Sequence, residues 1–365
     1  MKRKLRVGVL FGGRSGEHEI SLLSAKSVLA ALDRDKYDVT EIGIDRDGRW
    51  LLSENPMKEL SDDAANQDSE ESLVQSERHG LLSVRGDSHP DAVSKLDIVF
   101  PVLHGPYGED GTVQGLLEMA GIPYVGAGVL GSAVGMDKAV MKALLSQAGL
   151  NVSPYRLMLA IDWRSRPQAV AAQITGEFGY PVFVKPANLG SSVGISKVHN
   201  GSEFAPAMDL AAQYDRRILV EQAVEDAREI ECSVLGNDRP EASICGEIFP
   251  AGEFYDYESK YFDDRSRTVI PADLPDDLHN RIRAMAVKVF TTLDLSGMAR
   301  VDFLLRRADE KIFVLEANSI PGFTQISMYA KLWEASGIPY AELVDRLIEL
   351  GLERFRERSE LRITP

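Results

Sequence analysis

The stretch that decides the fold reads Ala299-Arg300-Val301-Asp302-Phe303-Leu304-Leu305, then a short charged turn, then Ile312-Phe313-Val314-Leu315-Glu316-Ala317-Asn318. Two apolar runs around a charged turn predict a β-hairpin. If the turn centres on Asp309, Asp302 lies directly opposite Glu316, and Arg300 lies opposite Asn318. Because side chains alternate between the two faces of a strand, these four residues share one face.

The facing carboxylates predict a bound cation. Carboxylates directly opposite each other repel and destabilise a bare sheet, and a divalent cation between them reverses that effect. Asp302, Glu316 and Asn318 offer only oxygen ligands, which suit Mg²⁺ working with substrate phosphates rather than zinc or iron. The alternative is a solvated acidic face, but the flanking residues are apolar on both faces. A register shift of one residue undoes the pairing.

The composition is that of an ordinary globular protein with an acidic balance. The 365 residues suffice for two or three domains, 44% of them are hydrophobic, and the formal net charge is −15. This charge argues against nucleic acid or an anionic membrane as partner, so local cations must hold any anionic ligand. No run approaches the ~18 apolar residues of a membrane span, and the basic N-terminus is no signal peptide. We expect a cytoplasmic protein in which Cys232 and Cys245 are buried, reduced thiols.

The order of expected elements predicts an α/β protein of three domains. Strands at 5–11, 37–44 and 96–102 alternate with a helix at about 19–32, which predicts a parallel sheet with ligand loops at the carboxyl ends of its strands. Residues 53–95 are polar and predict surface excursions. Further helices are expected at 112–120, 137–147 and 277–293 and from about 340, with strands and two helices in 150–250. The domains are predicted at 1–140 (α/β), 141–228 (small, α+β) and 229–365 (α+β).

Two glycine-rich segments differ in what they indicate. Residues 126–131 match a dinucleotide fingerprint, but no acidic strand end follows about twenty residues later, so a turn at a domain boundary is favoured. Residues 184–194 place Lys185 at a strand end before a turn of small residues, which offers an ammonium and backbone N–H donors to phosphates. An ordinary glycine hairpin is the competing interpretation of that segment. Lys138, at the head of a helix, is a second candidate phosphate-binding cation.

Three further segments carry candidate binding residues. Glu221, Ala223 and Val224 are candidates for holding an adenine edge, with Glu229 for ribose hydroxyls. Ser15 and Glu17 follow the first strand, where helix capping is the strong alternative to ligand binding. Residues 249–271 form a long stretch dense in aromatic residues, which predicts a lid.

Taken together, these motifs resemble the D-alanine–D-alanine ligase family of ATP-grasp enzymes, over about residues 7–350. The motifs that carry the resemblance are Gly-Gly-Arg-Ser-Gly-Glu-His-Glu-Ile-Ser (12–21), His-Gly-Pro-Tyr-Gly-Glu-Asp-Gly (104–111), Met-Asp-Lys (136–138), Lys-Pro-Ala-Asn-Leu-Gly-Ser-Ser-Val-Gly (185–194), Phe-Tyr-Asp-Tyr-Glu-Ser-Lys-Tyr (254–261), Ala-Arg-Val-Asp-Phe (299–303) and Glu-Ala-Asn-Ser-Ile-Pro-Gly-Phe-Thr (316–324). The resemblance implies an ATP-grasp fold, with ATP between the second and third domains. It also implies ATP-dependent ligation of two D-alanines through an acyl phosphate, for peptidoglycan precursor synthesis.

The resemblance also implies a role for each matching residue. Asp302, Glu316 and Asn318 would hold a pair of Mg²⁺ (or Mn²⁺) ions. The residues implied in catalysis are Glu17, Ser191, Tyr261, Arg300 and Gly322. Those implied in substrate binding are His104, Lys260, Ser327 and Met328. Those implied in ATP binding are Lys138, Lys185, Ser192, Glu221, Ala223, Val224, Glu229 and Phe254. A homodimer is expected from the family.

Two other functions remain open. A ligase that takes D-lactate as second substrate shares the fold, although Tyr261 in the lid favours the dipeptide product. A non-catalytic nucleotide-binding protein on the same scaffold is the rival from another class. The joint presence of Lys185, Arg300, Asp302 and Glu316 argues against it.

Overall fold

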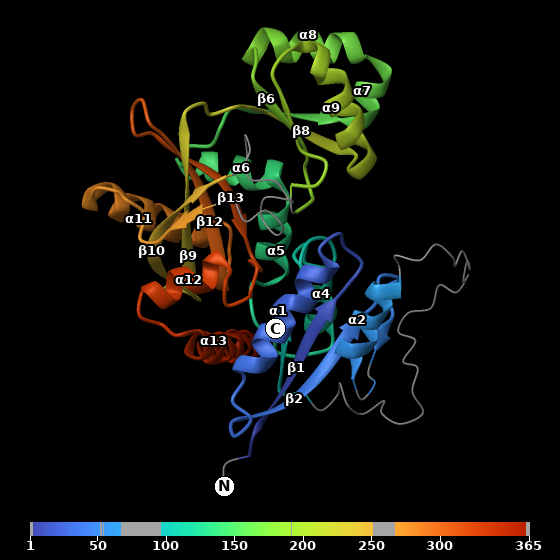
Figure 1. Cartoon of the computed structure of the whole chain (residues 1–365), viewed down its shortest axis with the longest axis vertical. Helices are drawn as coiled ribbons and strands as arrows, with labels where there is room; N and C mark the ends of the chain where they lie inside the picture. The colour runs from blue at the N-terminus through green and yellow to red at the C-terminus, as the bar shows by residue number, and fades with distance from the viewer. Residues whose placement is uncertain are drawn as a thin grey trace.

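A computed structural model of the protein describes residues 3–51, 53, 55–66, 96–190, 192–250 and 267–362. Within these residues the chain forms three sheets with helices packed against them (Figure 1). The predicted mixed α/β class is therefore confirmed. None of the helices in the described ranges has the length and apolar composition needed to cross a membrane.

The first sheet has the strand order β3-β2-β1-β4. Its strands are β1 (Leu5–Gly12), β2 (Tyr37–Ile44), β3 (Trp50–Leu51) and β4 (Ile98–Pro101), and its helices are α1 (His18–Ala31), α2 (Pro56–Asn66) and α4 (Thr112–Met119). Strand β1 is parallel to both β2 and β4, as predicted, while the short edge strand β3 is antiparallel to β2. The central strand β1 is buried from Val7 onward, which explains its continuous apolar run.

The second sheet is antiparallel, with the order β5-β8-β6-β7. Its strands are β5 (Tyr155–Leu159), β6 (Val182–Pro186), β7 (Ser196–Val198) and β8 (Arg217–Gln222), and its helices are α7 (Ala160–Ser165), α8 (Pro167–Phe178) and α9 (Gly201–Tyr214). The prediction of two helices in this part is wrong, because three are present among the described residues. The extra helix α7 has six residues and directly follows β5, so it is too short to show its own periodicity.

The third sheet is antiparallel, with the order β11-β10-β9-β12-β13. Its strands are β9 (Ala227–Gly236), β10 (Glu241–Phe249), β11 (Arg267–Val269), β12 (Gly297–Arg306) and β13 (Ile312–Asn318). Helix α11 (Asp276–Thr292) lies between β11 and β12 in the chain, and α12 (Met328–Ala335) and α13 (Tyr340–Glu360) follow β13. The predicted hairpin is confirmed, with Asp302 paired to Glu316 and Arg300 paired to Asn318. Beyond Asp302 the register shifts by one residue.

The glycine-rich passage 126–131 was predicted as a turn, and the structure corrects this. Gly128 caps a helix, α5 (Val129–Met136), which leads directly into α6 (Lys138–Gln147). Gly131 lies inside α5, where an added Cβ would come within 2.2 Å of the carbonyl oxygen of Asp294. The glycine therefore permits close packing of α5 against the end of α11.

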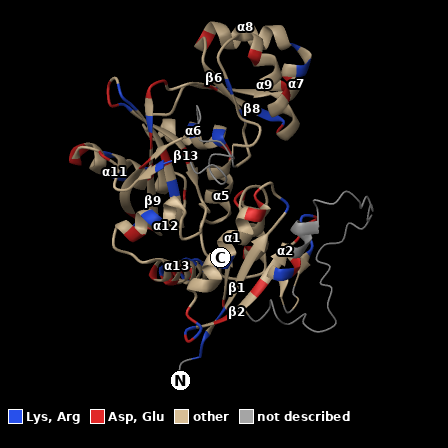
Figure 2. Cartoon of the chain, in the orientation of Figure 1, with Lys and Arg blue, Asp and Glu red and all other residues tan. Residues whose placement is uncertain are grey.

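The largest core links the first sheet to the C-terminal part of the chain. Phe323, which follows β13, packs against Phe100 of β4 with ring centroids 5.7 Å apart, and α13 lies in the same apolar cluster. Cys232 and Cys245 are buried and unbridged, as predicted, and face each other across the β9–β10 ladder. In the described parts of the chain, basic and acidic residues are interspersed over all three sheets and their helices (Figure 2).

Candidate active site

The paired carboxylates of the hairpin belong to a longer acidic row. Asp302 pairs with Glu316 on β13 and also with Glu231 on β9, so three carboxylates cross the third sheet side by side. Glu231 was missed by the sequence reasoning. Its spacing of two residues from Glu229 within a strand was the available signal, because residues two apart share a face.

Arg300 neutralises part of this row. Its guanidinium donates two hydrogen bonds to Asp302, both 2.8 Å long, and its Nε lies 3.1 Å from a carboxylate oxygen of Glu231. The amide of Asn318 donates a third hydrogen bond to Asp302, at 3.1 Å. Burial lowers the pKa of Arg300, but the carboxylates of Asp302 and Glu231 outweigh burial and raise it above its ordinary value. Arg300 is therefore a fixed, charged donor at the centre of the site.

A second row of side chains crosses one face of the second sheet (β5-β8-β6-β7), which we call the central sheet. Glu221 on β8 pairs with Phe183 on β6, which pairs in turn with Lys197 on β7. Lys185 lies two residues beyond Phe183 and shares its face. Phe183 and Lys197 were also missed, because sequence alone does not show which strands are neighbours.

The two rows line one cavity of about 340 Å³. Of the predicted site residues, those that line it are Lys185, Ser192, Glu221, Ala223, Val224, Glu229, Asp302 and Glu316. Its walls combine the charged rows with apolar and aromatic side chains, among them Phe183 and Leu304. A cavity that pairs cations and carboxylates with an apolar wall suits a ligand with both a planar base and phosphates.

Glu221 is the centre of a buried charge cluster, the lysine–glutamate triad Lys142–Glu221–Lys185. Its carboxylate lies 2.9 Å from the ammonium of Lys142 and 2.8 Å from that of Lys185. Burial raises the pKa of Glu221, but the two ammonium groups outweigh it and lower the pKa to about 2. Lys142 was missed, although it lies four residues after Lys138 on α6 and therefore near the same face.

Lys138 ties α6 to the turn that follows β6. Its ammonium donates to the carbonyl of Leu189 at 2.6 Å, and its backbone N–H donates to the carbonyl of Ala187 at 2.9 Å. Asp137 caps α6 and forms an ion pair with Arg217 of the central sheet. Lys138 thus holds the first part of the predicted phosphate-binding turn, at Ala187 and Leu189.

Glu17 faces two glycine loops. It occupies the N-cap position of α1, so the alternative in which Ser15 caps this helix is wrong. An added Cβ at Gly105 or at Gly190 would come within 2.8 Å of a Glu17 carboxylate oxygen. The carboxylate of Glu17 therefore lies against both the loop at Gly105 and the candidate phosphate-binding turn at Gly190.

The segment that follows β13 brings the remaining described candidates together. His104 is buried, with Nδ1 3.0 Å from the carbonyl oxygen of Ile320. The hydroxyl of Ser327 accepts from the backbone N–H of Thr324 at 3.1 Å, and a Cβ added to Gly322 would lie 3.3 Å from it. Met328 begins α12 and is buried. Ser191, Phe254, Lys260 and Tyr261, and most of the predicted lid, lie outside the described residues.

The predicted metal ligands, Asp302, Glu316 and Asn318, suit magnesium, which is held partly by water and substrate, better than a metal that needs a full set of protein ligands. Across the described ranges, no group of three or more His, Cys, Asp and Glu side chains is gathered so as to hold a metal ion. The predicted set has two carboxylates and one amide. Mg²⁺ is usually held by one or two carboxylates together with water and substrate phosphates, so this sparse oxygen set is compatible with it.

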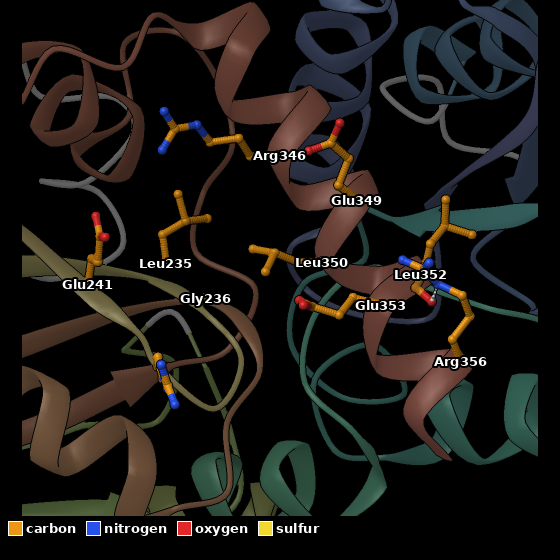
Figure 3. Close-up of a pocket in the computed structure, with 10 residues that line it drawn as sticks. Leu235, Gly236, Glu241, Arg346, Glu349, Leu350, Leu352, Glu353 and Arg356 are labelled. Carbon is orange, nitrogen blue, oxygen red and sulfur yellow. Dashed lines mark hydrogen bonds between the residues drawn. The ribbon is translucent and has the colours of Figure 1, made fainter. Parts of the chain in front are cut away.

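A larger cavity lies apart from these residues. It has a volume of about 650 Å³ and lies between α13 and the turn that follows β9 (Figure 3). Arginine and glutamate side chains such as Arg346, Glu349 and Arg356 line it, together with leucines. It shares no lining residue with the smaller cavity, and it contains none of the predicted site residues.

Comparison with known proteins agrees with this geometry. Residues 6–127 match the family model described as D-ala D-ala ligase N-terminus, and residues 144–349 match D-ala D-ala ligase C-terminus. A D-alanine–D-alanine ligase of Natranaerobius thermophilus is 48% identical over 98% of this chain and 97% of its own length. The structure of the D-alanine–D-alanine ligase from Coxiella burnetii is 38% identical, with a TM-score of 0.80, and the alignment covers 98% of this chain and 96% of that one.

One further solved structure widens the comparison. The VanG D-Ala:D-Ser ligase from Enterococcus faecalis is 33% identical with a TM-score of 0.79, over 96% of this chain and 100% of that chain. The three sheets and the likeness to these solved ligases define an enzyme of the ATP-grasp class. Within that class, the chain belongs to the D-alanine–D-alanine ligase family.

Proposed function

We propose that this protein is a D-alanine–D-alanine ligase, which joins two D-alanines and converts ATP to ADP and phosphate. The dipeptide serves peptidoglycan precursor synthesis. The observation that carries the proposal is the acidic row, with Asp302 at its centre and Arg300 bonded to it, which lines one cavity together with the lysine-bearing row. Full-length similarity to proteins named D-alanine–D-alanine ligase supports it.

The first chemical step is phosphoryl transfer. A carboxylate oxygen of the first D-alanine attacks the γ-phosphorus of ATP, the bond to ADP breaks, and an acyl phosphate forms. Lys138 and Lys185 bind phosphate oxygens, with the Ser191–Ser192 turn over them. Lys185 lies near the end of β6 and the ammonium of Lys138 reaches the turn that follows it, where they offer positive charge to the transferred group.

The second step forms the peptide bond. The amine of the second D-alanine, after losing a proton, attacks the acyl carbonyl, and phosphate leaves from the tetrahedral intermediate. Arg300 and the backbone N–H of Gly322 stabilise the oxyanion. Because Arg300 is already held by two carboxylates, it needs little reorganisation when the charge develops.

Substrate and nucleotide contacts complete the assignment. Glu17 pairs with the ammonium of the first D-alanine, while Ser327 and Lys260 receive the carboxylate of the second, beside His104 and Met328. The backbone at Ala223 and Val224, with Glu221 and Phe254, holds adenine, and Glu229 binds the ribose. A hydrogen-bond chain from Glu17 through Ser191 to Tyr261 latches the lid and excludes water, which otherwise hydrolyses the acyl phosphate.

Asp302, Glu316 and Asn318 are the residues that would hold a pair of Mg²⁺ or Mn²⁺ ions. When bound, these ions neutralise negative charge on the phosphates. The facing of Asp302 and Glu316 on one ladder supports this assignment, since like charges directly opposite each other are otherwise destabilising.

The wider organisation is part of the same proposal. We divide the chain into an N-terminal domain (1–140), a central ATP-grasp subdomain (141–228) and a catalytic domain (229–365) with the lid at about 249–271. The enzyme acts in the cytoplasm as a homodimer, without nucleic-acid or membrane partners. The acidic charge of −15 supports the last point.

Product identification tests the proposal. Purified protein is incubated with ATP, MgCl₂ and D-alanine, and products are separated by chromatography and identified by mass. D-alanyl-D-alanine and phosphate in equal amounts are expected, with neither formed from L-alanine or after chelation of the metal. Absence of the dipeptide near neutral pH contradicts the proposal.

A change of second substrate is the alternative that the comparison favours. One similar structure is of a D-Ala:D-Ser ligase, and the family resemblance also leaves D-lactate open as second substrate. Parallel incubations of D-alanine with D-serine or with D-lactate distinguish these products by mass. Predominance of a mixed product over the dipeptide in an equimolar mixture assigns the alternative.

A further inference from the structure

The backbone of Ile320, two residues before Gly322, is held at both its N–H and its carbonyl oxygen. Its backbone N–H donates to Glu109 at 3.0 Å, and its carbonyl oxygen lies 3.0 Å from Nδ1 of His104. The second oxygen of Glu109 accepts from the backbone N–H of Gly105 at 2.9 Å. One carboxylate therefore joins the loop after β4 to the segment after β13.

Ser24 on α1 holds the other side of Gly322. Its hydroxyl lies 3.2 Å from Nε2 of His104 and accepts from the backbone N–H of Phe323 at 3.3 Å. Ser24, His104 and Glu109 thus contact the chain directly before and directly after the dipeptide Pro321–Gly322. We name these three residues the loop-holding network.

The chemistry of the acceptors fixes where the protons lie. A carbonyl oxygen only accepts, so Nδ1 of His104 carries the proton and donates to Ile320. Nε2 then accepts from the hydroxyl of Ser24, whose oxygen accepts from Phe323. Burial lowers the pKa of His104, partly opposed by Glu17, which agrees with a neutral ring. Burial raises the pKa of Glu109 to about 8 and outweighs the backbone N–H groups of Gly105 and Ile320, which both donate to Glu109 and lower its pKa.

The network is built into the interior of the protein. Ser24, His104 and Glu109 expose 0%, 3% and 9% of their surface. Both ring nitrogens of His104 are engaged by protein atoms in this state, so the ring supports the backbone rather than presenting a free nitrogen to a ligand. None of the three lines the 340 Å³ cavity.

We propose that Ser24, His104 and Glu109 are positioning residues that fix the Ile320–Phe323 segment, so that the Gly322 N–H is aimed at the oxyanion before substrate arrives. The inference rests on the proposed function, because Gly322 has this role only in acyl transfer. Oxyanion donors act through preorganisation, and a displacement of about 1 Å can cost about 10²-fold in rate. Pro321 offers no N–H of its own, so restraint must come from the residues on either side.

The competing explanation is that the loop-holding network only stabilises the contact between the first sheet and the segment that follows β13. Kinetics separates the two. Ser24→Ala removes the bridge to Phe323, and Glu109→Gln replaces one acceptor oxygen by an amide that faces a donor. If the residues position Gly322, both variants reduce kcat for dipeptide synthesis by about 10- to 100-fold. The KM for ATP stays within about twofold, because the nucleotide site is lined by other residues.

His104 provides a conservative test. The side chain of His104→Gln retains one donor and one acceptor, whereas His104→Ala retains neither. A positioning role predicts that Gln restores at least about tenfold of the kcat lost in the Ala variant, with an unchanged pH profile. A shift of the pH profile in the Gln variant, or a rise in KM for D-alanine at constant kcat, overturns the proposal in favour of direct action on substrate.

Asp209→Ala is the matched control for loss of stability. Asp209 accepts a 2.7 Å hydrogen bond from the buried indole of Trp163 in the central sheet's helical layer, and it has no place in the proposed chemistry. It should lower the thermal midpoint without lowering kcat. If Ser24→Ala and Glu109→Gln behave like this control, the network is only structural and the proposal is wrong. Failure of the wild-type protein to make the dipeptide instead overturns the proposed function, and the inference with it.

Discussion

The lysine–glutamate triad gives the sharpest prediction about stability. Glu221 is almost fully buried, and its carboxylate contacts Lys142, whose side chain is 0% exposed, and Lys185, whose side chain is 9% exposed. Removing one partner of a buried ion pair costs about 3–5 kcal/mol, because the remaining charge is left uncompensated. Glu221→Gln leaves two such ammonium groups. We therefore expect a loss of about 3–5 kcal/mol from a total free energy of unfolding of about 5–15 kcal/mol.

The second substitution decides whether charge is the cause. Lys142 is fully enclosed, while Lys185 borders the cavity and can be hydrated there. Adding Lys142→Met to Glu221→Gln removes the enclosed charge and keeps an apolar chain of similar length. The double variant should therefore recover about 1–3 kcal/mol relative to Glu221→Gln alone.

The pH dependence follows with a definite sign. In the wild type, Glu221 has a folded-state pKa of about 2, below its unfolded value, so its contribution is present above about pH 4.5 and is lost as the pH falls toward 2. Burial already lowers the pKa of Lys142 in the wild type, where the Glu221 carboxylate partly opposes it, and Glu221→Gln removes that opposition and lowers the pKa further. The unfolded variant then binds more protons, and its stability rises as the pH increases toward about 10.

Urea denaturation measures these differences, with an exposed ion pair as control. Glu177→Gln breaks the pair between Arg156 and Glu177, whose side chains are 52% and 32% exposed, and should cost at most about 1 kcal/mol. The reasoning is refuted if Glu221→Gln costs no more than this control. It is equally refuted if the double variant is destabilised by the sum of its single changes.

Three other substitutions test separate parts of the structure. Asp302→Asn should lower kcat for ligation by about 10²-fold or more, while Glu231 still pairs with the guanidinium of Arg300; full retained activity contradicts the facing-carboxylate argument. Gly131→Ala should lower the free energy of unfolding, measured with urea, by about 1–3 kcal/mol because the added Cβ meets a backbone carbonyl. Gly176→Ala in α8 is the control, because open space surrounds that position, and it should raise the free energy of unfolding by about 0.5–1 kcal/mol. Equal effects of the two substitutions contradict the packing explanation. Hydrogen bonds from Arg6 lower the pKa of Asp97, so Asp97→Asn should cost about 1–3 kcal/mol near neutral pH. The difference from wild type should begin to shrink at about pH 4, the unfolded pKa, and should shrink further as the pH falls toward the depressed folded-state pKa; a constant difference across that range argues against ionic pairing.

Local pattern was sufficient to predict that β12 and β13 form a hairpin. The pairs of Asp302 and Arg300 agree with counting from a turn centred on Asp309, but the pairs nearest the turn, such as Leu305 with Ile312, do not, and the shift beside Asp302 restores the predicted pairing. The counting fails only beyond Asp302, where the register shifts by one residue. Such a shift leaves no signal in composition, because it inserts an ordinary apolar residue into an apolar strand.

Neighbour relations between distant segments were beyond the reach of the sequence. Glu231 joins the acidic row because β9 lies beside β12, and chain spacing does not determine this order. Lys142 looks like a solvent-facing helix residue until Glu221 is seen to pair with it. Helix α5 was missed because glycine disfavours helices, and only the close approach of Gly131 to the end of α11 explains its presence there.

The charge distribution explains how so acidic a protein can bind a polyanion. The net charge of −15 is spread over the whole chain, and exposed charges are screened over about 8 Å at physiological salt. Lys142, Lys185 and Arg300 instead lie at or beneath the cavity wall, each held by a carboxylate, where screening is weak. The carboxylate partner therefore already compensates the cost of removing each cation from water, before a phosphate binds. Binding then depends on short-range exchange of partners within the site, so the KM for ATP should respond only weakly to added salt.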